Sequence, residues 1–179
     1  MTTRPAAAPP DRPPAQVTDA RRAAADVCAD LRHGELLDPA FEARSARLDA
    51  RDRRWLQELL FGMLRRRAQL DTRLASRVTG GLGRLDADVV DLLRLGADQL
   101  LHMNSVPAYA AIAQTVELVK ERHGVGASRL ANAVLRRLDR ERGAADEETA
   151  TDPVEALALA HSHPRWLVAR WVARLERSR

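Results

Sequence analysis

Residues 106–138 read VPAYAAIAQTVELVKERHGVGASRLANAVLRRL, and this stretch decides the fold. Apolar side chains recur every three or four residues in two runs, which is the spacing of one buried helix face. The runs are Ala108, Ile112, Val116 and Val119, followed by Leu130, Val134 and Leu138. Gly124 and Gly126 separate the runs, and Pro107 suits a first helical turn, where a missing N–H costs nothing. We therefore predict two helices joined by a short glycine-containing turn.

The chain before this hairpin shows the same periodicity in four further segments. Apolar stripes predict helices from Thr18 to about His33, around Leu56 to Leu64, over Leu70 to Val78, and from Asp86 to Met103. Residues 34–49 show little periodicity and contain Asp38-Pro39, which predicts a loop with room for one short turn. No strand pattern competes with these helices. We therefore predict an all-α fold, a compact bundle of about six helices.

Composition divides the chain into a domain and flanking segments. Residues 1–15 carry five prolines among alanines and charged residues, which is typical of a disordered tail. Residues 16–142 are predicted to form the helical domain, 143–160 an acidic linker, and 161–179 a further helical segment. That last segment is opened by Pro164 and carries Trp166, Leu167, Trp171 and Leu175.

The sequence favours a cytoplasmic protein without a membrane partner. Cys28 is the single cysteine and cannot form an internal disulfide, so a reducing compartment is expected. The N-terminus lacks the continuous apolar core of a signal peptide. No later segment approaches the roughly 18 uncharged residues of a membrane span.

No catalytic, cofactor or metal site is predicted within this chain. The sequence contains no Gly-x-Gly-x-x-Gly after a strand, no Walker loop, no His-Glu-x-x-His and no Gly-x-Ser-x-Gly. Cys28 lies in the middle of a predicted helix without a nearby base, so we interpret it as a packed side chain. His161 and His163 are two residues apart and would point to different sides of a helix, which argues against shared metal ligation.

Arginine is the main candidate for binding chemistry. Lysine and arginine number 29 against 25 aspartates and glutamates, for a net charge of +4, and only Lys120 is a lysine. Guanidinium groups contact phosphate bidentately and stack on unpaired bases, which suits RNA. The candidates near helix ends are Arg21, Arg22, Arg65, Arg66 and Arg136. A solvated basic face, or salt bridges to neighbouring carboxylates, are the alternatives.

Four motifs carry a resemblance to a known family. They are Arg21-Arg22-x-Ala24, the Asp52-Arg53 to Arg65-Arg66 segment with Leu60-Phe61-Gly62, Val106-Pro107, and Asn132-Ala133-Val134-Leu135-Arg136. Together they resemble the NusB-like RNA-binding domain, in the variant at the N-terminus of bacterial 16S ribosomal RNA (cytosine-C5) methyltransferases. The tail from Ser162 to Trp171 is similar to the segment that leads into the methyltransferase module of that family. Gln114 departs from the Asn or Glu that the family often carries there.

The resemblance implies roles for individual residues. Arg21, Arg22, Arg65, Arg66 and Arg136 would contact RNA, and Gly62 would permit close helix packing. Asn132 would either tie down backbone between helices or contact RNA directly.

The resemblance also implies a function and leaves two alternatives. The leading hypothesis is the RNA-recognition domain of a ribosomal RNA methyltransferase, whose S-adenosylmethionine site lies in a module absent from this chain. The runner-up is a stand-alone NusB-type antitermination factor that binds RNA with a small-subunit ribosomal protein. A third is a protein-interaction bundle that docks through Trp166 and Trp171.

Overall fold

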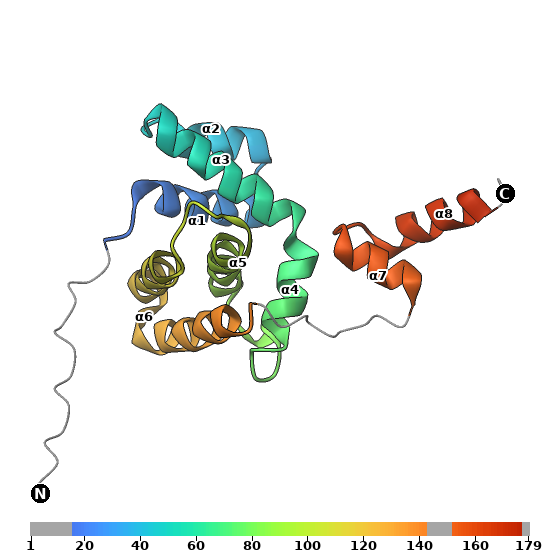
Figure 1. Ribbon diagram of the computed structural model, residues 1–179. Coiled ribbons are helices and arrows are strands. Elements are labelled where there is room, and N and C mark those ends of the chain that lie inside the picture. Colours follow the sequence, from blue (N-terminus) through green and yellow to red (C-terminus); the bar gives the residue numbers. More distant parts are fainter. Residues whose placement is uncertain (1–15, 143–151, 177–179) are drawn as a thin grey trace, which may run out of the picture.

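The structure is a computed structural model that describes residues 16–142 and 152–176, and within these ranges it contains helices and turns but no strand. The helices are α1 (Asp19–Arg32), α2 (Leu37–Ser45), α3 (Ala50–Arg65), α4 (Arg67–Ala75), the short 3-10 helix η1 (Leu82–Arg84), α5 (Ala87–His102), α6 (Ala108–Arg140), α7 (Pro153–Ala160) and α8 (Arg165–Glu176). Figure 1 shows a bundle built from α1 to α6, with α7 and α8 to one side. The all-α prediction is confirmed. The predicted tail, residues 1–15, and positions 143–151 of the predicted linker lie outside the described residues.

Helix α5 is the centre of the bundle. Every residue from Val89 to Leu100 is buried, and the helix packs against α1, α3, α4 and α6. Figure 1 views α5 nearly end-on with the other helices around it. Asp86 caps the helix as predicted, because its side chain accepts a hydrogen bond from the Asp88 N–H at 2.8 Å. Because α5 also buries Asp91, Arg94, Asp98 and Gln99, it needs polar as well as apolar partners on the surrounding helices.

The predicted helical hairpin is confirmed as a sharp bend within α6. Gly124 has φ +79° and ψ −176°, a backbone conformation that L side chains rarely adopt, so a glycine is required there. The two halves of α6 therefore point in different directions while both pack on α5. Pro107 lies immediately before Ala108, at the N-cap of α6.

The predicted loop over residues 34–49 is wrong in part, because Leu37–Ser45 forms α2. Pro39 falls within the first turn of this helix, where proline breaks no intrahelical hydrogen bond. Ala40, Phe41 and Ser45 are buried, and the Phe41 ring meets that of Phe61 edge-on at 5.9 Å. The short helix thus depends on a tertiary contact with α3 that local periodicity does not reveal.

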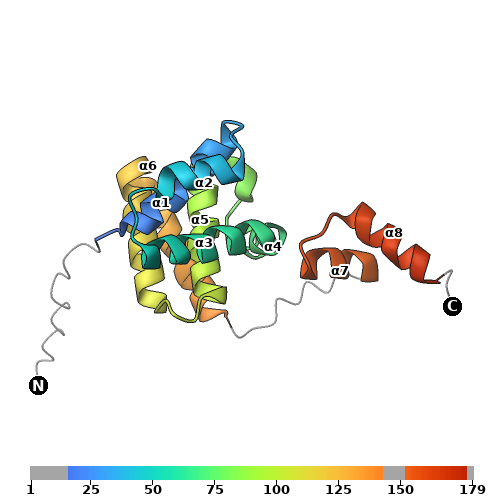
Figure 2. The ribbon, with the colours of Figure 1, turned by 90° about the horizontal axis from the view of Figure 1, so that it is seen from above.

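The last two helices form a hairpin beside α4. Figure 2 shows α7 and α8 projecting from the bundle. Residues 153–160, which the sequence placed in an acidic linker, form α7, and the Asp152 side chain caps it by accepting from the Val154 N–H. The Gln69 amide in α4 donates a hydrogen bond to the Ala160 carbonyl oxygen, which joins this hairpin to the bundle.

Candidate nucleic-acid interface

Arg21 is held inside the bundle and does not face solvent freely. It is 8% exposed, and its Nε donates to Gln99 Oε1 at 2.8 Å. Its Nη1 donates to Thr18 Oγ1 and to Gln114 Oε1, both at 3.1 Å. Burial lowers the pKa of Arg21 to about 10, so the guanidinium remains charged at neutral pH. Arg21 therefore joins α1 to α5 and α6, and Gln114 keeps a structural role despite its departure from the family pattern.

The aromatic ring under Arg21 comes from α3. The Arg21 guanidinium carbon lies 4.6 Å from the centre of the half-buried Trp55 ring, a cation–π contact. The contact brings the start of α1 against the first turns of α3.

Arg22 lies at the surface, but its charge is offset. Both of its terminal nitrogens donate to the Glu121 carboxylate in α6, one of them at 2.9 Å, and the hydrogen bond from Arg22 lowers the pKa of Glu121. Arg22 can meet a phosphate only by sharing or exchanging this partner.

Arg66 forms a buried ion pair with α5. Its Nε lies 2.7 Å from Asp98 Oδ1 and its Nη2 lies 2.9 Å from Oδ2, and Asp98 is fully buried. A Cβ at Gly62 would lie 2.3 Å from Arg66 Nη2, so Gly62 provides the space for this pair. Of the two roles considered for Arg66, RNA contact and a salt bridge to a neighbouring carboxylate, the structure shows the salt bridge.

Arg65 and Arg136 present their guanidinium groups to solvent. Within the described ranges Arg65 has no hydrogen-bonding or ionic partner. Arg136 Nε donates to the amide oxygen of Asn132, one turn earlier in α6, at 2.9 Å. Asn132 therefore orients an arginine, and its own contact with RNA stays a prediction.

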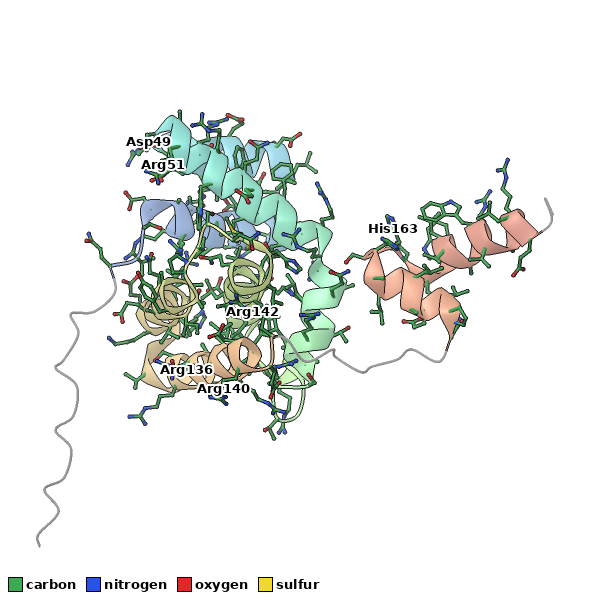
Figure 3. The ribbon with its side chains drawn as sticks, in the orientation of Figure 1. Asp49, Arg51, Arg136, Arg140, Arg142 and His163 are labelled. Atoms are coloured by element: carbon green, nitrogen blue, oxygen red, sulfur yellow. The ribbon has the colours of Figure 1, made fainter. Side chains whose placement is uncertain are left out.

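Two exposed arginines that the sequence did not select lie at the start of α3. Arg51 and Arg54 are exposed and have no side-chain partner among the described residues, whereas Arg53 between them is paired with Glu42. Asp49 caps this end of α3 by accepting from the Arg51 and Asp52 N–H groups, and Figure 3 places Asp49 and Arg51 beside α1. The cluster of arginines at this end of α3 is visible in the sequence. Only the structure shows that Arg53 is paired and that Arg51 and Arg54 are not.

Three arginines near the starts of α1 and α3 constitute the α1–α3 rim: Arg22, Arg51 and Arg54. Arg51 lies one turn before Trp55 on α3, and Trp55 holds Arg21, the neighbour of Arg22. The Arg21–Trp55 contact thus brings the start of α1, which carries Arg22, against the first turns of α3, which carry Arg51 and Arg54.

The remaining candidate residues behave as packed or surface side chains. Cys28 is buried, and burial raises the pKa of its thiol to about 12. His161 and His163 are exposed, and the His163 ring meets the Trp171 ring edge-on at 5.3 Å. Within residues 16–142 and 152–176, no three histidine, cysteine or acidic side chains could together hold a metal ion. Trp166 is 65% exposed and Trp171 46% exposed.

The fold and its surface define a helical-bundle domain with uncompensated arginines, and no helix in its described part is long and apolar enough to cross a bilayer. The chain belongs to the NusB family, which matches residues 18–140.

Curated relatives of this chain are much longer proteins. A probable ribosomal RNA small subunit methyltransferase B of Bacillus subtilis is 35% identical over 128 residues, which are 72% of this chain and 28% of the relative. The ribosomal RNA small subunit methyltransferase B of Pseudomonas putida is 37% identical over 148 residues, covering 82% of this chain and 33% of the relative. A putative methyltransferase of Mycobacterium tuberculosis is 33% identical over 157 residues, and the match covers 83% of this chain and 34% of the relative. The chain thus spans about a third of the length of these relatives.

A solved structure shares the fold. A chain of the crystal structure of antitermination factors NusB and NusE in complex with dsRNA superposes with a TM-score of 0.62 and 21% identity. The match covers 68% of this chain and 94% of that chain.

Proposed function

We propose that this chain is the RNA-recognition domain of a ribosomal RNA cytosine-C5 methyltransferase. The observation that carries the proposal is the extent of its likeness: most of the chain matches ribosomal RNA methyltransferases at 35–37% identity, yet it spans only about a third of them. A domain of such an enzyme that holds no catalytic motif has substrate RNA as its natural partner.

The α1–α3 rim is the surface that supports this function best. Arg51 and Arg54 are exposed and uncompensated, and Arg22 is half-exposed with one hydrogen-bonding partner, Glu121. Guanidinium groups of this kind contact phosphates bidentately, and such contacts release counterions. The rim would position RNA by binding the phosphate backbone of the RNA. Arg21 holds α1 and α3 together through its contact with Trp55.

Methyl transfer itself would belong to the rest of such an enzyme. S-adenosylmethionine supplies the methyl group, and the resemblance implies a Rossmann-like sheet for its site. Residues 16–142 and 152–176 hold no strand, so they do not fit that site. The role proposed for this chain is therefore confined to binding and orienting RNA.

The test is RNA binding by charge-matched variants. We expect Arg51→Gln with Arg54→Gln to weaken binding of a fluorescent 16S ribosomal RNA helix-loop fragment by roughly tenfold at low salt. Arg44→Gln with Arg53→Gln removes the same charge, but from arginines that are paired with Asp30 and Glu42, and should change binding little. Equal affinities for the two double variants would contradict the rim assignment. Charge reversal at Arg21 is a poorer test, because it would also disrupt the buried network.

A stand-alone antitermination-type factor is the second candidate, and the structural match to NusB favours it. Such a factor would bind RNA together with a small-subunit ribosomal protein. Co-purification of that ribosomal protein with this chain would support the second candidate. An antibody to this domain separates the two: a cellular protein more than twice 19.8 kDa supports the methyltransferase, and one of about 20 kDa supports the factor.

A further inference from the structure

We propose that the second half of α6 carries a separate surface that grips the phosphate backbone of an RNA duplex. The surface, named here the α6 stripe, consists of Arg129, Arg136 and Arg140. The inference rests on the proposed function in one respect, which is that the partner is RNA. It adds a second contact region outside the α1–α3 rim.

Helix geometry places the three arginines in one row. They are separated by seven and four residues, so at 100° per residue they lie within about 40° of one another around the helix. Eleven residues at 1.5 Å each extend the row over about 16 Å. All three residues are exposed. The row is therefore a straight ridge of positive charge, a shape that can follow a regular row of phosphates.

The charge of the stripe is not offset by neighbouring carboxylates. In the part of the chain that the structure describes, none of Arg129, Arg136 and Arg140 is in an ion pair. The nearby carboxylates are already used: Asp139 pairs with Arg142 at 3.1 Å, and Glu141 pairs with Arg137 and Arg77, both at 2.8 Å. Arg136 is steadied by Asn132, a neutral partner that leaves its charge intact.

The side chains between the arginines favour a polyanion over a protein or a membrane. Ala133 and Asn132 are the residues of this face between Arg129 and Arg136, and neither is a large apolar side chain. A protein interface would need an aromatic or aliphatic anchor, and a membrane-binding helix would need an apolar face beside its cations. A duplex recognised by shape and backbone needs only the charge row.

The stripe lies on a different side of the molecule from the rim. Figure 3 shows Arg136 and Arg140 together at one edge of the bundle, across the other helices from Arg51 at the start of α3. An RNA that contacts both surfaces must therefore extend around the bundle. We accordingly expect stripe and rim to contribute independently to RNA affinity.

The test compares two double variants on the same helix. Arg136→Gln with Arg140→Gln removes two stripe charges, and Arg137→Gln with Arg142→Gln removes two exposed charges that are paired with Glu141 and Asp139. Binding to a blunt-ended RNA duplex is measured by fluorescence anisotropy as a function of salt. We expect the stripe variant to bind about tenfold more weakly at low salt, with a salt slope reduced by about two. The control should keep the wild-type slope.

Three outcomes would overturn the inference in distinguishable ways. If the wild-type chain binds the duplex and the stripe variant matches it in affinity and slope, the stripe is wrong and the proposed function stands. If the stripe variant loses as much affinity for a single strand of equal length, the assignment to a duplex is wrong. If the wild-type chain binds no RNA at low salt, the inference fails together with the proposed function.

Discussion

The Arg66 guanidinium and the Asp98 carboxylate form a two-point ion pair between the end of α3 and the centre of α5, with contacts of 2.7 and 2.9 Å. Asp98 has no exposed surface, whereas Arg66 keeps about a quarter of its own. An arginine that family resemblance assigns to RNA binding is therefore engaged in holding two helices together.

Removing one partner of this pair should destabilise the fold. Arg66→Ala leaves an unpaired carboxylate in the core, and we expect a loss of about 3–5 kcal/mol in the free energy of unfolding. Arg65→Ala, next to it and exposed, should change that energy by no more than about 0.5 kcal/mol. Urea unfolding of the two variants makes the comparison. Similar stabilities would show that the Arg66–Asp98 pair does not support the bundle.

Arg21 and Arg22, which are neighbours in α1, should likewise differ in how much they contribute to stability. Arg21→Ala would leave Gln99 without its donor inside the bundle, at a cost of about 1–3 kcal/mol. Arg22→Gln removes only an exposed pair with Glu121, worth about 0–1 kcal/mol. Thermal unfolding at fixed pH measures both. A larger loss for Arg22→Gln would refute this division of roles.

Gly96 in α5 and Gly126 in α6 should respond oppositely to substitution by alanine. A Cβ at Gly96 would lie 2.9 Å from Thr115 Cγ2 and 3.1 Å from Leu135 Cδ1, so Gly96→Ala should destabilise by about 1–3 kcal/mol. A Cβ at Gly126 would meet nothing within 4 Å, so Gly126→Ala should stabilise α6 by about 0.5–1 kcal/mol. Denaturant midpoints test the signs, and destabilisation by both would contradict the packing described for α5 and α6.

Stability should fall in acid partly through Asp88. Burial alone would raise the pKa of its carboxyl, but hydrogen bonds from His123 and Arg32 hold that pKa below its ordinary value. A carboxyl whose pKa is lower in the folded than in the unfolded protein stabilises the fold. This stabilisation is complete above the pKa of the unfolded state, about 3.9, and is lost as the pH falls through the pKa of the folded state. Asp88→Asn should therefore be less stable at pH 7, with a smaller further loss below about pH 4. Parallel pH profiles for the two proteins would show that Asp88 carries no such linkage.

Most of the fold could be predicted from the sequence, because its helices are strongly amphipathic or end at clear signals. Local sequence signals mark the N-cap of α5 at Asp86, the bend of α6 at Gly124 and the apolar stripe of α5. Helix α2 could not be predicted, since its stability comes from the contact of Phe41 with Phe61 across two helices.

The site was harder to predict because an exposed and a buried arginine look alike in sequence. Gln99 and Gln114, which bind Arg21, and Asp98, which binds Arg66, lie in α5 and α6, 32 to 93 positions away along the chain. Conversely, Arg51 and Arg54 stand out only once Arg53 is seen to pair with Glu42. Distance along the chain, rather than residue type, limited the prediction.

The most direct test of the central claim is a salt titration of RNA binding. The wild-type chain is titrated against a 16S ribosomal RNA helix-loop fragment between about 50 and 200 mM salt, and the logarithm of the association constant is plotted against that of the salt concentration. Binding through several arginine–phosphate contacts predicts a straight line that falls by about one unit of slope for each contact. Failure to bind at the lowest salt, or affinity that salt leaves unchanged, would contradict the account.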